Sequence, residues 1–208
     1  VLEKFIDFEK EIAVIVSRNS DGDISNYPVV ELEFNSEANL VEFLYSPANV
    51  TAEQSTEAIS IARKVIEKLN MVGLLAVEMF VTKQGTILVN EIAPRPHNSG
   101  HQTIEGNVTS QYEQHLRAIF NLAPGSTQIT RPSVMVNLLG EKGFTGDAIY
   151  EGFNEAMSMP GVHVHLYGKK ITKPFRKMGH VTVTADTLQA AKRISLAVKE
   201  ILKLTRDK

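Results

Sequence analysis

The chain has 208 residues, of which 43% are hydrophobic, and this is enough for one or two domains with a buried core. Its formal net charge of −2 and its lack of cysteine exclude a generally basic nucleic-acid binder, disulfides, thiolate catalysis and cysteine-ligated metal centres. Since no apolar run approaches the roughly 18 residues that span a bilayer and no secretory signal opens the chain, we expect a cytoplasmic protein without a membrane partner.

Hydrophobic periodicity and turn residues predict both strands and helices in the first 125 residues. An Asp21-Gly22 turn joins two strands into a hairpin, and Thr51 with Gln54 has the spacing of a capping box that begins a helix. The predicted strands cover 11–18, 24–34, 40–45, 72–81 and 86–92, and the predicted helices cover 51–70 and 108–122.

A change of composition predicts a domain boundary near residue 125. Ala123-Pro124-Gly125 is followed by a polar stretch that reaches Pro132, as is typical of a linker. Beyond it, the predicted strands cover 133–139, 162–167 and 180–185, and the predicted helices cover 146–157 and 188–204. We therefore expect an α+β fold with mainly antiparallel sheets and two domains, residues 1–125 and 126–208.

Two glutamates are expected to face each other across a predicted hairpin. If Gln84-Gly85 forms a two-residue loop, paired positions sum to 169, and Glu78 lies opposite Glu91 with Cβ atoms roughly 4.5–5.5 Å apart. Like charges in an apolar strand need a cation or a shared proton, and carboxylates combined with phosphate oxygens suit Mg²⁺. We therefore predict a Mg²⁺ site at this pair. A one-residue register shift would instead send one glutamate to solvent, and a three-residue loop would break the pairing.

A stiff polar loop follows the second glutamate. Pro94 and Pro96 fix the backbone on both sides of Arg95, so the loop should be extended and rigid. Arginine offers a planar fork for carboxylate-like anions, and histidine can donate or transfer a proton. We therefore predict that Arg95, His97 and Asn98 hold a second anionic reactant beyond the metal site.

A zinc site is the alternative for the two histidines of this loop. His97 and His101 have the four-residue spacing that aligns ligands on one face of a helix. Pro96 and Gly100 argue against a helix there, and the sequence offers no obvious third ligand.

Three blocks of the sequence together span nearly the whole chain. The blocks are EKFIDFEKEIAV (residues 3–14), VNEIAPRPHNSGH (residues 89–101), and YGK (residues 167–169) with RKMGH (residues 176–180). In this order they resemble the ATP-grasp superfamily and, within it, the N5-carboxyaminoimidazole ribonucleotide synthase family. The middle block is the most distinctive of the three.

The resemblance implies a fold and an activity. The fold is an ATP-grasp C-terminal subdomain over residues 1–125, followed by a small α/β C-terminal domain over residues 126–208 with a basic loop for substrate phosphate. The activity is an ATP- and Mg²⁺-dependent ligation in de novo purine biosynthesis. ATP phosphorylates bicarbonate to carboxyphosphate, and the exocyclic amine of 5-aminoimidazole ribonucleotide is then carboxylated with release of ADP and phosphate. The resemblance also implies a homodimer.

The resemblance assigns four groups of site residues by their motif positions. The group for adenine, ribose and the ATP phosphates is Glu3, Lys4, Phe5, Ile6, Glu11, Asn90 and Glu91. The metal group is Glu78 and Glu91. The group for bicarbonate and carboxyphosphate is Arg95, His97 and Asn98. The group for the phosphate of the ribonucleotide is Lys169, Arg176 and Lys177. Strict alternation along a strand places Asn90 on the opposite face from Glu91, so its role requires a local twist or a backbone contact.

The chain departs from the family pattern in two ways. The family has an N-terminal dinucleotide-fold-like domain and a small lid domain with phosphate-binding lysines, whereas this chain begins at Val1, directly in an amphipathic stretch. We therefore expect a piece of a longer protein, with weak or no turnover by itself. In addition, Phe34 closes the stretch 31–34, which stands where the family has a polar nucleotide-side motif ending in histidine.

The sequence also leaves other functions open. Another ATP-grasp ligase, such as formate-dependent glycinamide ribonucleotide transformylase, has a similar Pro-Arg-Pro-His segment, although the continuation over 98–101 favours the carboxylating family. A non-catalytic interaction or dimerisation fragment is the alternative outside enzymes. The five basic residues of 169–177 could also form a solvated hairpin tip or a nucleic-acid contact, which the acidic first quarter of the chain opposes.

Overall fold

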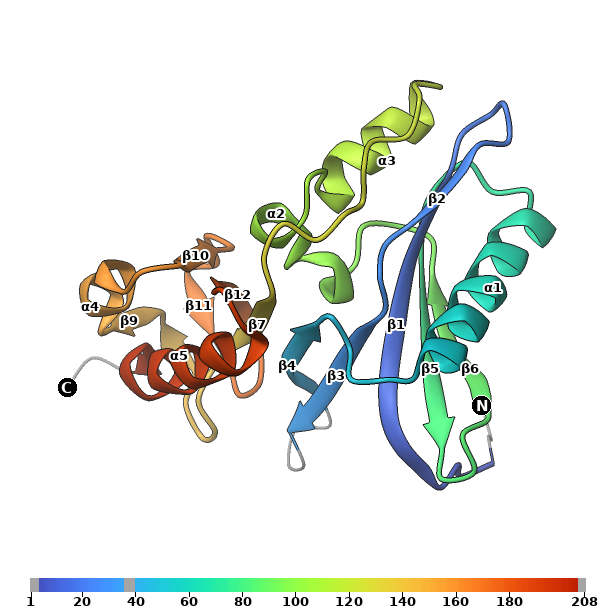
Figure 1. Ribbon diagram of the computed structural model, residues 1–208. Coiled ribbons are helices and arrows are strands. Elements are labelled where there is room, and N and C mark those ends of the chain that lie inside the picture. The colour runs from blue at the N-terminus through green and yellow to red at the C-terminus, as the bar shows by residue number, and fades with distance from the viewer. Residues whose placement is uncertain (1–3, 36–39, 206–208) are drawn as a thin grey trace. The chain divides into compact units, whose positions relative to one another are not determined.

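The computed structural model describes residues 4–35 and 40–205 and divides the chain into two compact units. The first unit comprises Val1–Glu33 and Tyr45–Thr130, and the second comprises Phe34–Leu44 and Arg131–Lys208. The chain passes from the first unit to the second within β3 (Val30–Asn35) and returns within β4 (Leu40–Ser46). Both units combine antiparallel strands with helices (Figure 1), which confirms the predicted α+β class.

The first unit is built on an antiparallel sheet in the order β3-β1-β5-β6, with β2 paired to the end of β1. Its remaining elements are β1 (Phe8–Arg18), β2 (Ile24–Asn26), α1 (Ala52–Lys68), β5 (Gly73–Thr82), β6 (Ile87–Ala93), the 3-10 helix η1 (Asn98–Gly100), α2 (Thr103–Gly106) and α3 (Gln111–Ile119).

Local sequence explains where several of these elements begin and end. The predicted capping box is present at α1, where Gln54 N–H donates to the Thr51 hydroxyl and the Gln54 side chain accepts from Thr51 N–H. Such a cap contributes about 1 kcal/mol. The single strand predicted over 24–34 is wrong, because Pro28 has no N–H to donate and separates β2 from β3.

One face of this sheet is apolar and is covered by α1 (Figure 1). Alternate residues of β1 and β5, such as Val14 and Val77, are fully buried against Ala58, Ala62 and Ile66 of the helix. Burying such aliphatic side chains stabilises the fold by about 1.5–3 kcal/mol each. This layer therefore holds the strands that carry the candidate site.

The opposite face of the sheet changes character along β5. At one end α3 packs on β1 and β5, and Tyr27 joins Leu74 and Ala76 in a smaller apolar cluster. Two residues further along β5 stands Glu78, which shares this face with Ala76 because side chains alternate along a strand. The face opposite α1 thus passes from an apolar contact to an acidic surface within one strand.

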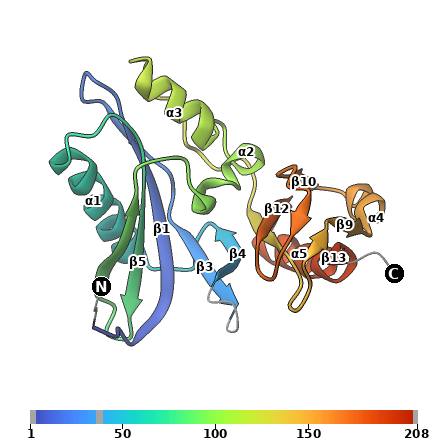
Figure 2. The same ribbon diagram turned by 180° about the vertical axis from the view of Figure 1, so that it is seen from behind.

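The strands of the second unit lie in the order β10-β12-β7-β4, and β12 is antiparallel to both β10 and β7. The elements of this unit after residue 130 are β7 (Ser133–Leu139), β8 (Gly146–Asp147), β9 (Ile149–Glu151), α4 (Phe153–Ser158), β10 (Val162–Leu166), β11 (Ile171–Thr172), β12 (Lys177–Thr184), α5 (Leu188–Ile201) and β13 (Lys203–Thr205). Figure 2 gives the reverse view of this unit, in which α5 packs on β7 and β12. Within the described residues, no helix is both long and apolar enough to cross a membrane.

Three predicted helices differ from the structure. The helix expected over 188–204 ends at Ile201, and residues 203–205 form β13. The helix expected over 146–157 is wrong for its first half, which forms the short strands β8 and β9, and the helix begins only after Gly152, whose φ of 73° is left-handed. The helix expected over 108–122 is shorter, because Ser110 caps it and α3 starts at Gln111.

Candidate functional site

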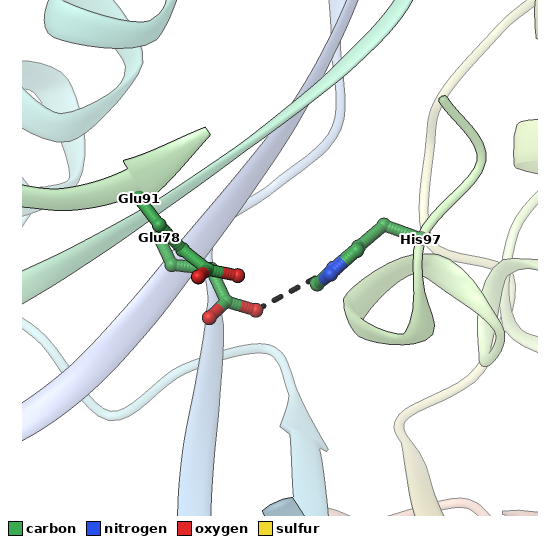
Figure 3. A group of neighbouring side chains, drawn as sticks. All are labelled: Glu78, Glu91 and His97. Atoms are coloured by element: carbon green, nitrogen blue, oxygen red, sulfur yellow. Dashed lines mark ion pairs between the residues drawn. The ribbon is translucent and has the colours of Figure 1, made fainter. Parts of the chain in front are cut away.

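Three side chains of the first unit converge on one point of the acidic face. Glu78 comes from β5, Glu91 from the paired strand β6, and His97 from the loop that follows β6 (Figure 3). One ligand atom from each of the three lies within 4.8 Å of the others. Two carboxylates at this separation repel each other and favour a bound cation or proton.

The predicted pairing of Glu78 with Glu91 is confirmed, but the predicted loop is wrong. Thr82 N–H donates to the Thr86 carbonyl, so the hairpin loop has three residues and paired positions near it sum to 168, as in Val81 and Ile87. A β-bulge between Met79 and Glu78 then shifts the register by one residue, and Glu78 meets Glu91.

The residue that the bulge adds is Asn90. Val89 pairs with Met79 and Glu91 pairs with Glu78, so Asn90 stands between them without a cross-strand partner position of its own. A bulge interrupts strict alternation and redirects a side chain. Strict alternation therefore does not apply at Asn90, and its side chain need not point away from Glu91.

Glu11 is a third carboxylate on the same face. Ala13 pairs with Glu78 and Glu11 pairs with Phe80, so Glu11 and Glu78 share a face of neighbouring strands. Burial, together with the charge of Glu91, raises the pKa of Glu11 to about 7. Without a cation, Glu11 therefore holds a proton over part of the neutral pH range.

The imidazole of His97 is held close to Glu78. Its Nδ1 atom lies 3.4 Å from Glu78 Oε1, which makes an ion pair whenever the ring is protonated (Figure 3). The same atom lies 2.9 Å from the Ser99 hydroxyl and accepts from Ser99 N–H, as the N-cap of η1. The Nδ1 atom of His97 therefore lies beside both a hydrogen-bond donor and a carboxylate.

The other two residues predicted to bind the anion, Arg95 and Asn98, make contacts different from those of His97. Arg95 is exposed, and its Nη1 atom donates to the Pro96 carbonyl at 3.1 Å. Asn98 is half-buried as the first residue of η1. Arg95 thus presents its guanidinium to solvent rather than to the glutamates, where a dissolved oxyanion can reach it.

The segment before β1 supplies the predicted adenine contacts. Glu3 lies outside the described residues. Phe5 is 86% exposed, Lys4 is exposed, and Ile6 is half-buried. A phenylalanine ring this exposed offers an apolar face against which a flat ring could stack.

The basic loop of the second unit connects β10 to β12. Lys169 Nζ donates to the Lys177 carbonyl and lies 5.3 Å from the centre of the Tyr167 ring. Arg176 is exposed, with Nη1 donating to the Ile171 carbonyl at 2.8 Å. The structure therefore brings Lys169 and the Lys177 backbone together and anchors Arg176 by a separate contact.

A zinc pair of His97 with His101 finds no support in the described residues. The ligand cluster found there contains His97 but not His101. His101 Nδ1 instead lies 2.9 Å from the Tyr112 hydroxyl and 3.1 Å from Gln111 Nε2.

The sequence interpretation missed the residues that support His97. Gln111 is fully buried, and its side chain bonds to the His97 backbone. The signal was present in principle, because Gln111 and Gln114 lie on the same side of α3 as the buried Ala118. Polar residues in an apolar stripe indicate a buried hydrogen-bond partner.

Two family models match this chain. Residues 1–112 match the ATP-grasp domain, and residues 133–194 match the phosphoribosylaminoimidazole carboxylase C-terminal domain. The predicted domain boundary after residue 125 falls between the two matches and itself stays a prediction.

Curated relatives and solved structures agree with these matches. The chain is 44% identical over 193 residues to phosphoribosylaminoimidazole carboxylase of Vigna aconitifolia, covering 90% of this chain and 34% of the relative. It is 43% identical over 182 residues to N5-carboxyaminoimidazole ribonucleotide synthase of Bacillus subtilis, covering 88% of this chain and 46% of the relative.

A crystal structure of N5-carboxyaminoimidazole ribonucleotide synthetase from Thermotoga maritima superposes with a TM-score of 0.91 at 50% identity, over 99% of this chain and 55% of that one. The corresponding Aspergillus clavatus enzyme in complex with ADP and 5-aminoimidazole ribonucleotide gives 0.85 at 38% identity, over 95% of this chain and 52% of that one. The chain thus spans between a third and about half of these relatives. It belongs to the ATP-grasp family, and it carries ATP-grasp sequence followed by the C-terminal domain of the phosphoribosylaminoimidazole carboxylases.

Proposed function

We propose that the protein containing this chain carboxylates 5-aminoimidazole ribonucleotide with bicarbonate at the expense of ATP, giving N5-carboxyaminoimidazole ribonucleotide, ADP and phosphate. The observation that carries the proposal is the convergence of Glu78, Glu91 and His97 in a chain that matches both family domains. The second domain match favours this reaction over formyl transfer and over a purely structural fragment.

Glu78 and Glu91 would hold Mg²⁺ in this reaction. Their carboxylate oxygens are the hard ligands that Mg²⁺ takes together with phosphate oxygens, and their mutual repulsion in the absence of a cation supports the assignment. When bound, the metal neutralises negative charge on the transferring phosphoryl group. Asn90, at the bulge beside Glu91, would donate to the ATP phosphates.

The nucleotide itself would lie along the start of β1. Lys4, Phe5 and Ile6, with Glu3 before them, would contact adenine, and Glu11 would accept from the ribose hydroxyls. The exposure of Phe5 and the position of Glu11 on the acidic face support this arrangement.

Bicarbonate would lie beyond the metal, against Arg95, His97 and Asn98. A bicarbonate oxygen forms a bond to the γ-phosphorus while the bond from that phosphorus to the ADP oxygen breaks. The amine nitrogen of the ribonucleotide then bonds to the carboxyl carbon of carboxyphosphate, the carbon–oxygen bond to phosphate breaks, and the nitrogen loses a proton. The guanidinium of Arg95 would bind the oxyanion, and the imidazole of His97 is the nearby group able to move a proton.

The second unit would supply charge for the phosphate of the ribonucleotide. Lys169, Arg176 and Lys177 gather on the connection from β10 to β12, and a short basic cluster of this size suits a single phosphate. We further propose a homodimer, as the family resemblance implies, located in the cytoplasm and with no nucleic-acid or membrane partner.

Isotope transfer in the whole protein tests the reaction. With bicarbonate labelled by oxygen-18, one labelled oxygen should appear in the released phosphate, and carbon label should appear in the ribonucleotide product. Phosphate without label would refute the carboxyphosphate route. Incorporation of labelled formate in place of bicarbonate would support the formyl-transfer alternative.

A further inference from the structure

We propose that Gln111 is the positioning residue for His97, and that its side-chain amide fixes the imidazole in the bicarbonate pocket. This inference rests on the proposed function, because it concerns how that pocket is built. Gln111 Oε1 accepts from His97 N–H at 2.9 Å, and Gln111 Nε2 donates to the His97 carbonyl at 2.8 Å. One side chain thus satisfies both backbone polar groups of a residue that is 14 positions away in the sequence.

The orientation of this amide is fixed by its partners. A backbone N–H can only donate and a backbone carbonyl can only accept, so the oxygen and the nitrogen of Gln111 cannot exchange places without losing both bonds. Gln111 is fully buried, so water cannot replace the lost bonds cheaply. Glutamine is therefore the residue type that this position requires, since leucine offers neither group and glutamate lacks the donor.

Two further residues hold the amide in place. Thr103 accepts from Gln111 N–H at 2.8 Å through its hydroxyl and donates to the Gly100 carbonyl at 2.6 Å, which ties the start of α3 to η1. A Cβ atom at Gly100 would clash with the Gln111 side chain, so this glycine makes room for the amide. Gly100, Thr103 and Gln111 together form what we name the His97 clamp.

The clamp acts on the position of the ring because the ring follows its backbone. His97 Nδ1 lies 3.4 Å from Glu78 Oε1, and this distance depends on where the His97 peptide is held. A displacement of about 1 Å at a catalytic group can cost about 100-fold in rate. Gln111 touches neither reactant in the proposed pocket, and its effect is exerted through His97.

Gln111 also contributes to the tautomer of His101, whose Nδ1 atom lies 2.9 Å from the Tyr112 hydroxyl as well. Its Nε2 atom, already identified as a donor, lies 3.1 Å from His101 Nδ1. That nitrogen must present a lone pair, so neutral His101 carries its proton on Nε2. The tautomer of His101 can be measured by spectroscopy, and it depends on the Gln111 amide but not on whether the enzyme is active.

Gln114 provides a matched control on the same helix. It is 1% exposed, and its amide donates to the Ser17 hydroxyl at 3.1 Å and accepts from Gly125 N–H at 3.0 Å. Substituting either glutamine removes buried hydrogen bonds from α3. Only Gln111 bonds to His97 and His101.

The first test compares Gln111→Leu and Gln114→Leu in the whole protein. For Gln111→Leu we expect kcat/KM for bicarbonate to fall by about 10-fold to 100-fold, while KM for ATP stays within about twofold. For Gln114→Leu we expect kcat/KM for bicarbonate within about threefold of the wild-type value once stability is matched. A folded Gln111→Leu with wild-type kinetics, or an equal loss in both variants, would overturn the inference.

The second test uses Gln111→Glu and keeps the inference falsifiable if the leucine variant does not fold. A protonated carboxyl can donate to the His97 carbonyl and accept from His97 N–H, as the amide does, and burial raises the pKa of such a carboxyl. The ratio of variant to wild-type kcat/KM should therefore rise as pH falls, while titrations of groups that residue 111 does not contact cancel in the ratio. A ratio independent of pH would contradict the positioning role.

Imidazole nitrogen NMR separates this inference from the proposed function. The His101 signals should report the Nε2–H tautomer in the wild type and should change in Gln111→Leu or Gln111→Glu but not in Gln114→Leu. Absence of bicarbonate-dependent activity in the wild type would refute the proposed function alone. Unchanged His97 and His101 signals in the Gln111 variants would refute the clamp alone.

Discussion

At the residue scale, three carboxylates on one face of a sheet gather negative charge that a bound cation or a proton would neutralise. Glu11, Glu78 and Glu91 share the face opposite α1, and burial together with the charge of Glu91 disfavours ionisation of Glu11. Glu78 is buried whereas Glu91 is exposed, so replacing Glu91 perturbs folding less. Glu91 is therefore the better position at which to test for a bound cation.

Glu91→Gln should weaken metal binding without unfolding the protein. An amide keeps the shape of the carboxylate but removes its charge, and we expect the affinity for Mn²⁺, used as a probe for Mg²⁺, to fall by at least about 10-fold. Electron paramagnetic resonance titration measures free Mn²⁺ directly. Glu113→Gln is the control, because Glu113 is an exposed α3 residue paired with Arg117. Equal Mn²⁺ affinity in Glu91→Gln and the wild type would contradict the metal assignment.

Glu11 should make the metal-free protein less stable as pH rises through neutrality. Its folded pKa of about 7 lies above the ordinary value of 4.5, so the folded state holds the proton more tightly than the unfolded state. That contribution to the free energy of unfolding is fully present below about 4.5 and is lost as pH rises through about 7. Glu11→Gln removes the dependence.

Urea denaturation at several pH values, in a metal chelator, measures this effect. The stability of Glu11→Gln relative to the wild type should increase between pH 5 and pH 8, about where the folded pKa lies. A constant difference between the two proteins across this range would show that Glu11 titrates normally.

At the element scale, the β5–β6 hairpin reaches its functional register through two irregularities. The three-residue loop alone would misalign the glutamates, and the bulge at Asn90 restores the pairing of Glu78 with Glu91. The bulge also places an amide side chain directly beside the second glutamate. The bulge therefore sets the register, and under the proposed function it also positions a donor for the ATP phosphates.

Asn90→Ala and deletion of Asn90 separate these two roles. The deletion leaves Glu91 opposite Glu78 in a regular ladder with a three-residue loop, whereas Asn90→Ala keeps the bulge and removes only the amide. If the amide donates to ATP phosphates, both variants should raise KM for ATP by about 10-fold, the usual effect of a lost bond to a charged group. A normal KM in Asn90→Ala with a raised KM in the deletion would assign the role to the backbone instead.

The elements that could be predicted from sequence are those specified by nearby residues. The capping box at Thr51 and the apolar run of β5 depend on neighbours a few positions apart, and both are present. The helix predicted over 146–157 failed because β9 pairs with β13, whose residues lie at the far end of the chain. The facing glutamates were predicted from spacing, but the loop and the bulge offset each other in a way that spacing cannot reveal. Gln111 was missed because its partner, His97, becomes a neighbour only after folding.

At the scale of the whole molecule, each unit has its own set of strands and its own covering helix. The first unit buries one sheet face under α1, and the second packs α5 on β7 and β12. The acidic cluster with His97 belongs to the first unit, and the basic loop of Lys169 belongs to the second. Because a curated relative such as the Bacillus subtilis enzyme is about twice as long, other parts of the whole protein should complete the nucleotide site.

This chain alone should therefore bind a divalent cation but turn over poorly. Glu78 and Glu91 are both present and paired, so Mn²⁺ binding should be retained and should be lost in Glu91→Gln. Bicarbonate-dependent phosphate release should stay at background, because the family's lid lysines, which would neutralise the ATP phosphates, are expected elsewhere in the whole protein. A coupled assay for ADP, run with and without the ribonucleotide, measures this, and the whole protein serves as the positive control. Robust ADP formation that depends on the ribonucleotide in the 208-residue chain would show that it already holds a complete active site.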